Sequence, residues 1–167
     1  MIPSNLQLKI RKMLSSEIGK NILISDSHII DGGCINNTCK ITTNYGSFFL
    51  KWNNNPSTNM FQLESKSLQL LRESNTMYIP QVILCNDKFI IMEFVKHDPP
   101  NHDFWAGFGK DLADLHKVSD ITFGLDYDNF IGSLKQYNKR KNRWTDFFIQ
   151  QRIIPQLNMG KFPTNIL

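Results

Sequence analysis

The sequence predicts an α+β fold in two parts, a strand-rich part followed by a helical one. Five short runs with strand character lie before residue 96, at 21–30, 38–44, 47–52, 78–85 and 88–95. Apolar residues recur at helical spacing near the N-terminus, in residues 59–72 and again after residue 103. This order is too rich in strands for a helical bundle and lacks the repeated βαβ pattern of a doubly wound sheet.

The boundary between the two parts falls in a polar, proline-containing stretch, KHDPPNHD. We therefore expect a first lobe over residues 1–95, a linker over 96–102 and a helical region over 103–167. In the helical region, Phe104, Phe108, Leu112 and Leu115 form one apolar stripe. A later helix is expected to start near Thr145 or Asp146, and Pro155 should kink or end it.

Turn and cap residues delimit the elements of the first lobe. Ser4 is a candidate N-cap and Gly19 a candidate stop for an amphipathic surface helix. Gly32-Gly33 and the NYG sequence at 44–46 separate three strands, and Asn86-Asp87 is a two-residue connection compatible with a hairpin.

Composition restricts the classes of function. The net charge of +4 and the pI of about 9.0 favour an anionic ligand but give little support for nucleic-acid binding. No apolar run is long enough to span a bilayer, and the N-terminus lacks the features of a signal peptide. The three cysteines have no zinc-ligand spacing, and their odd number indicates a reducing, cytoplasmic setting.

Two charged residues stand among apolar ones. Glu64 shares a helix face with Phe61, Leu68 and Leu71, where a carboxylate is costly unless it is paired. Lys51 follows three apolar residues on a strand and shares a face with Phe49. Each could simply reach water at an edge. Together, a lysine on the third strand and a glutamate on the next helix form the arrangement that kinase-like folds use to hold ATP phosphates.

Other segments fit the same hypothesis. Gly32-Gly33 could bring backbone N–H groups close to a phosphate, although most such pairs are ordinary turns. The strand at 88–95 would end at a hinge, where the carbonyl of Glu93 and the N–H of Val95 could face adenine, or it could be a plain buried strand. Because neither GxxxxGK[ST] nor a full GxGxxG occurs, P-loop and dinucleotide-binding folds are not supported.

Several segments together resemble the fructosamine (ketosamine) 3-kinases, relatives of the aminoglycoside and choline kinases within the protein-kinase-like fold. The resemblance runs from about residue 5 onward and includes GGCIN, FFLK, MFQLESKSL and FGKDLADLH. Its most specific segment is NFIGSLKQYN followed by WTDFFIQQR. It implies a five-stranded antiparallel nucleotide lobe with a helix, then the start of a helical lobe.

The resemblance also implies ATP- and Mg²⁺-dependent phosphorylation of the 3-hydroxyl of a ketosamine, the adduct that glycation leaves on an amine. Lys51 would hold phosphates and Glu64 would orient Lys51. The implied nucleotide-binding residues further include Gly32, Gly33, Cys34, Ile35, Asn36, Glu93, Phe94 and Val95. Asn129, Gln136, Asn138 and Trp144 would lie near the substrate groove. Thiolate character at Cys34 would make the glycine turn redox-sensitive, although an inert small residue is the simpler interpretation.

The family's catalytic loop, H-G-D-L-x-x-G-N, and its later metal-binding Asp have no match in the sequence. Asp126, Asp128 and Asn129 resemble metal ligands only superficially, and solvated loop carboxylates are the simpler interpretation. We therefore expect a truncated or degenerate homologue that is inactive alone. Its FWAGFGKDLADLH helix would remain partly uncovered, which favours marginal stability or self-association.

Three alternative functions remain open from the sequence. The first is a non-catalytic nucleotide-binding module, and the second is a small-molecule kinase of the aminoglycoside or choline type. The third is a basic nucleic-acid-binding domain that uses KQYNKRKNR, where five cations occur in nine residues. A solvated basic face is the simpler interpretation of that segment.

Overall fold

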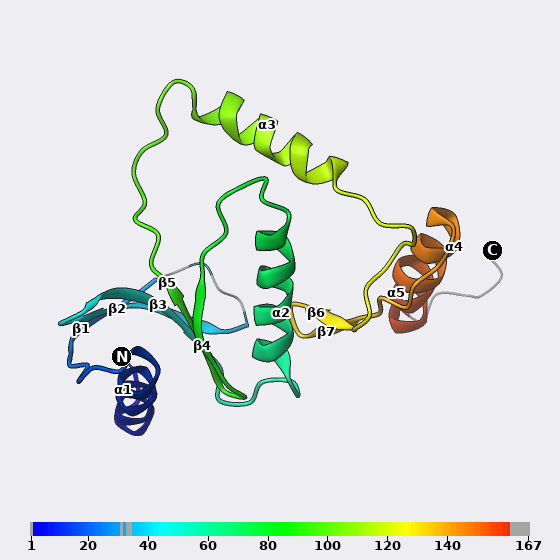
Figure 1. Cartoon of the computed structure of the whole chain (residues 1–167). Coiled ribbons are helices and arrows are strands. Elements are labelled where there is room, and N and C mark those ends of the chain that lie inside the picture. The colour runs from blue at the N-terminus through cyan, green and yellow to red at the C-terminus, as the bar shows by residue number, and fades with distance from the viewer. Residues whose placement is uncertain (1, 31, 33–34, 161–167) are drawn as a thin grey trace. The chain divides into compact units, whose positions relative to one another are not determined.

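A computed structural model describes residues 2–30, 32 and 35–160 of the chain (Figure 1). The chain divides into two compact units, Met1–Lys117 and Val118–Leu167, and each is described by itself below. The lobe and linker boundaries expected at 95 and 102 remain predictions. Among the described residues, no helix has the length and apolar character needed to cross a membrane.

The first unit contains the five-stranded antiparallel sheet that the sequence predicts. Its strands are β1 (Ile24–Ile29), β2 (Asn37–Thr43), β3 (Gly46–Trp52), β4 (Val82–Cys85) and β5 (Phe89–Glu93). They are arranged in the order β1-β2-β3-β5-β4, and each neighbouring pair is antiparallel. The NYG turn joins β2 to β3 as predicted, and Gly46 there has a φ of 131°.

Alternation along β3 divides the core into two layers. Phe48, Leu50 and Trp52 are buried in a cluster with Ile10 and Leu14 of α1 (Ser4–Ile18). On the opposite face, Phe61 of α2 (Met60–Glu73) belongs to a second buried cluster, with Leu68 and Phe49 packed against it. The two helices therefore cover opposite sides of the sheet (Figure 1). β5 is buried from both sides, because its first four residues divide between these clusters.

The ends of α1 fit the sequence prediction in part. The helix begins at Ser4 itself and its N-cap is Pro3, which makes no side-chain capping hydrogen bond. Ser4 is therefore not the N-cap. Gly19 ends the helix as predicted, with a φ of 70° that a residue with a side chain rarely adopts.

The β4–β5 hairpin also differs from prediction. Its connection holds three residues, Asn86, Asp87 and Lys88, rather than two. The Asn86 Oδ1 accepts hydrogen bonds from the backbone N–H groups of Lys88 and Phe89, at 2.8 and 3.1 Å. This local side-chain bond stabilises the longer turn.

Helix α3 (Phe104–Lys117) carries the predicted apolar stripe, but none of its residues is buried. Phe104 and Phe108 are each 45% exposed, and their rings stack with centroids 6.2 Å apart. The side chain of Trp105 is 68% exposed. The partial exposure expected for this helix is confirmed.

The second unit contains a hairpin that the sequence analysis missed, formed by β6 (Asn129–Ile131) and β7 (Leu134–Gln136). Its two-residue turn is Gly132-Ser133, and Gly132 has a φ of 63°. A Gly-Ser pair between two short runs is a recognised hairpin signal. Each strand has only three residues, however, which is too short for alternation to predict it.

A nearly continuous helical segment follows, as α4 (Trp144–Phe148), a π-helical turn (Ile149–Ile153) and α5 (Ile154–Gly160). Pro155 does not end the helix, and the hydrogen-bond pattern changes immediately before it. Proline cannot donate to the carbonyl four residues earlier, which belongs to Gln151. The Arg152 guanidinium donates to that carbonyl instead, at 3.0 Å.

Candidate functional site

Lys51 and Glu64 form a two-point ion pair in the first unit. The Lys51 Nζ donates to Glu64 Oε1 at 2.8 Å and to Oε2 at 2.9 Å. Their side chains are 26% and 27% exposed, so the pair is accessible at one side and not sealed in the core. The prediction that these two residues meet is confirmed, and neither reaches water unpaired at an edge.

The pair lies between the sheet and α2. Lys51 is in register with Thr38 of β2 and with Ile90 of β5, so it stands on a central strand. Phe61 is fully buried against Ile90, which anchors the first turn of α2 to the sheet. One helical turn separates Phe61 from Glu64, and this spacing brings the carboxylate over the lysine.

The registers define a surface that we call the α2 face, formed by alternate residues of the three central strands. Thr38, Lys51 and Ile90 form one transverse row; Lys40, Phe49 and Met92 form the next. Phe94, just beyond β5, continues the alternation of that strand and contacts Lys40, whose Nζ lies 4.8 Å from the centre of its ring. The α2 face thus runs from the Lys51–Glu64 pair toward the segment that follows β5.

The turn before β2 is described only in part. Gly32 has a φ of 122°, which favours glycine, and it is exposed. Gly33 and Cys34, two predicted nucleotide-binding residues, lie outside the described residues. The Asn53 Nδ2 donates to the carbonyl of Ile35 at 3.1 Å and to Asn36 Oδ1 at 2.9 Å. Asn53 directly follows β3 and was not singled out by the sequence analysis. Its side chain therefore ties the end of this turn to the end of β3.

The predicted hinge begins at the end of β5. The Glu93 carboxylate accepts a hydrogen bond from the Tyr78 hydroxyl, and this bond, with burial and the carboxylate's charge, raises the pKa of Tyr78. It also accepts from the backbone N–H of Gln81, at 3.4 Å. Because the side chain is engaged with the segment before β4, the backbone of Glu93 is the part suited to bind a base. Val95 is 47% exposed.

Two cysteines belong to the sheet, Cys39 buried in β2 and Cys85 half-buried at the end of β4. Burial raises the pKa of Cys39 to about 11, and burial together with the charges of Glu64 and Asp87 raises the pKa of Cys85 to about 11. Both thiols are therefore protonated at neutral pH and are weak nucleophiles.

In the second unit, Asn138 links several segments. It is only 2% exposed, and its Nδ2 donates to the Tyr127 carbonyl at 3.1 Å and to Asn129 Oδ1 at 2.9 Å. Its Oδ1 accepts from the Arg152 guanidinium at 2.7 Å, and its carbonyl accepts from the N–H of Leu125 at 2.8 Å. With every polar atom bound inside the protein, Asn138 is suited to positioning other residues.

The other predicted groove residues lie around this network. Gln136 is in register with Asn129 across the β6–β7 hairpin. Trp144 is 54% exposed and stacks on Phe148, with ring centroids 5.4 Å apart. Phe147 connects the two regions, since its ring contacts Trp144 and also lies 4.7 Å from the Arg152 guanidinium carbon. The structure thus brings Asn129, Gln136 and Asn138 together directly and Trp144 through Phe147.

The loop carboxylates of this unit bind cations of the basic segment. Arg140 contacts Asp126 at 2.6 Å and Asp120 at 2.7 Å, and Lys135 contacts Asp128 at 3.0 Å. Burial alone would raise the pKa of Asp128, but the N–H of Asn138 and the ammonium of Lys135 hold it below its usual value. Within the described residues, no three His, Cys, Asp or Glu side chains form a group suited to a metal ion. We therefore assign no magnesium ligand here.

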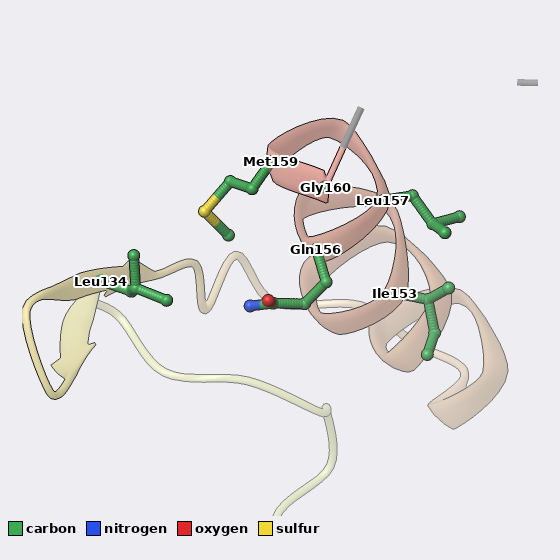
Figure 2. Close-up of a pocket in the computed structure, with 6 residues that line it drawn as sticks. All are labelled: Leu134, Ile153, Gln156, Leu157, Met159 and Gly160. Atoms are coloured by element: carbon green, nitrogen blue, oxygen red, sulfur yellow. The ribbon is translucent and has the colours of Figure 1, made fainter. Parts of the chain in front are cut away.

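A pocket of about 500 Å³ lies between β7 and α5 (Figure 2). Gln156 and Met159 extend from α5 toward Leu134 of β7, and Ile153, Leu157 and Gly160 complete the lining. The lining carries no charged group, so it offers nothing to bind a phosphate.

Comparison with known proteins decides the family. The family model described as fructosamine kinase matches residues 6–162. The chain belongs to the fructosamine kinase family. It is 34% identical over 160 residues to the probable ketoamine kinase of Vibrio parahaemolyticus. The alignment covers 91% of this chain and 55% of that protein. It is 31% identical over 159 residues to a chloroplastic protein-ribulosamine 3-kinase of Arabidopsis thaliana, covering 91% of this chain and 48% of that one.

Solved structures agree on the fold. A putative fructosamine-3-kinase from Haemophilus somnus matches with a TM-score of 0.82 at 25% identity, covering 91% of this chain and 53% of that one. A second, from Thermobifida fusca, matches with a TM-score of 0.78 at 23% identity and shows the fold alone. The chain spans about half the length of the curated relatives that it matches. The predicted family and kinase-like fold class are confirmed.

Proposed function

We propose that this chain provides the nucleotide-binding part of an ATP-dependent ketosamine 3-kinase. The Lys51–Glu64 pair is the observation that carries the proposal. Its ammonium is held at 2.8 and 2.9 Å by both carboxylate oxygens and is still about a quarter exposed. A cation fixed in this way can meet phosphate oxygens without a loss of side-chain freedom on binding.

In this proposal the rest of the nucleotide lies along the α2 face. Lys51 would bind the phosphates, and the glycine turn, tied down by Asn53, would cover them with backbone N–H groups. The base would reach the backbone of Glu93 to Val95. These roles rest on the family resemblance together with the registers of β2, β3 and β5.

Residues of the second unit would shape the substrate groove. Since Asn138 is 2% exposed and fully hydrogen-bonded, its role would be to hold Asn129 and Arg152 in place. The exposed ring of Trp144 is better suited to contact a substrate directly. Ketosamines are proposed as substrates because similar proteins are named ketoamine kinase and protein-ribulosamine 3-kinase.

Phosphoryl transfer also needs a carboxylate base and metal ligands. The sequence contains no H-x-D, so the proposal assigns ATP binding but no turnover to the 167 residues alone. A reducing, cytoplasmic setting belongs to the same proposal and rests on the three cysteines, which lack any disulfide or zinc spacing.

The test combines binding with turnover. ATP affinity of the 167-residue chain is measured by calorimetry, and phosphate transfer is assayed on a ketosamine, an aminoglycoside and choline. We expect saturable ATP binding that Lys51→Met weakens about a hundredfold, and no transfer to any of the three. A folded chain that does not bind ATP would contradict the proposal. Transfer to choline or the aminoglycoside would overturn the substrate assignment.

A further inference from the structure

Lys40 is a second cation on the α2 face, one transverse row from Lys51. Its partner across the β2–β3 ladder is Phe49, two residues before Lys51, so the two lysines are diagonal neighbours on one face. Such neighbours have Cα atoms roughly 7–8 Å apart, within the reach of long side chains. The lysine is half-buried, and its Nζ lies 4.8 Å from the centre of the Phe94 ring.

The two lysines differ in whether a carboxylate neutralises their charge. Glu64 neutralises Lys51 with both of its oxygens. Over the residues that the structure describes, Lys40 has no carboxylate within ion-pair distance. Asp26, on the strand paired with β2, contacts the Nε2 of His28 at 2.7 Å instead. Lys40 therefore gives the α2 face a positive charge that the Lys51–Glu64 pair does not.

A bound nucleotide must cross the row that contains Lys40. If its outer phosphates lie at Lys51 and its base at Glu93 to Val95, the ribose and the phosphate attached to it lie over the row of Lys40 and Phe49. An aromatic ring is a weak partner for an ammonium group, worth about 0.5–2 kcal/mol. A phosphate oxygen is a stronger one.

We propose that Lys40 binds the phosphate chain of the nucleotide, with its ammonium moving from the Phe94 ring to a phosphate oxygen. This inference rests on the proposed ATP binding and adds to it a residue that the family pattern did not indicate. It gives the site two cations with distinct duties. Lys51 is fixed in position by Glu64, whereas Lys40 is held only by a ring and can follow the ligand.

The experiment compares Lys40→Met with Lys20→Met. Methionine keeps the unbranched stem and removes the charge, and Lys20 is a matched control because its Nζ also lies over a ring, that of Tyr45, at 4.5 Å. Affinities for ATP and for adenosine are measured by calorimetry, and circular dichroism verifies folding. Lys40→Arg, which keeps the charge, is the second variant in case the methionine variant does not fold.

We expect Lys40→Met to weaken ATP binding about tenfold and to change adenosine binding less than twofold. Lys20→Met and Lys40→Arg should bind ATP as the unmodified chain does. Unchanged ATP affinity in Lys40→Met, or equal losses for ATP and adenosine, would overturn the inference while leaving the proposed function intact. If Lys40→Met does not fold, a tenfold loss of ATP affinity in folded Lys40→Arg would overturn it as well. An unmodified chain that binds no ATP would instead overturn the proposed function.

Discussion

The ion pair of Lys51 and Glu64 gives the sharpest prediction about the mechanism of binding. Lys51→Met, Glu64→Gln and the double variant form a thermodynamic cycle that isolates the interaction of the two side chains. At 2.8 Å and an effective dielectric constant of about 20, the direct attraction is roughly 6 kcal/mol before lost hydration is subtracted. Because both groups are about a quarter exposed, the net coupling should be much smaller, at about 1–2 kcal/mol.

The same cycle predicts how ATP binding responds. In the proposed site Glu64 would act only by holding Lys51, so Glu64→Gln should weaken ATP binding about tenfold in the unmodified background and have no further effect in Lys51→Met. Urea unfolding gives the coupling energy, and calorimetry gives the affinities. Glu73→Gln is the matched control, because this exposed residue lies on the same helix and contacts Gln69.

Two results would refute this reasoning. A coupling energy below about 0.3 kcal/mol would mean that the pair contributes nothing measurable, as many exposed ion pairs do. A further loss of ATP affinity when Glu64→Gln is added to Lys51→Met would mean that the carboxylate acts on the nucleotide by another route.

Three other predictions concern stability and order. Burial raises the pKa of Cys39 from 9.0 to about 11, so folding favours the protonated thiol. Its contribution to the free energy of unfolding is therefore complete below pH 9 and decreases as pH rises toward 11. As pH rises from 9 to 11, urea unfolding should show a smaller loss of stability in Cys39→Ala than in the unmodified chain, by up to about 1.4 kcal/mol per pH unit. Parallel plots of stability against pH for the two proteins would contradict this prediction. Gly124→Ala should destabilise the second unit by about 1–3 kcal/mol in thermal unfolding, since φ is 124° and a Cβ would lie 2.5 Å from the Asn138 carbonyl oxygen; an unchanged melting temperature would count against the described loop. Asn53→Ala should increase hydrogen exchange at residues 35–36 while leaving β3 protected; unchanged exchange at 35–36 would show that Asn53 does not hold that turn.

Local patterns in the sequence were enough to predict which residues of β3 and α2 meet in the first unit. Strand alternation assigned Phe49 and Lys51 to one face, and the structure buries Phe48, Leu50 and Trp52 on the other. The costly position of Glu64 on an apolar helix face indicated a cation on the neighbouring sheet, because burial of an unpaired carboxylate is unfavourable.

The features that were missed depend on partners distant in sequence. Only the family resemblance indicated Asn138, and its burial was not predicted, because it depends on hydrogen bonds to residues nine to fourteen positions away. Asn53 reads as the first residue of a loop, yet its partners lie 17 and 18 positions earlier. Such contacts have no local periodicity, so propensity and spacing do not reveal them.

The location of the nucleotide on the α2 face is the central claim, and hydrogen exchange with and without ATP tests it most directly. We expect ATP to slow exchange at residues 35–36, in β3 and at 93–95, and to leave 129–138 unchanged. In Lys51→Met, the same concentration of ATP should not slow exchange at these residues. Protection confined to residues 118–160, or saturable ATP binding with no protection in the first unit, would contradict the account.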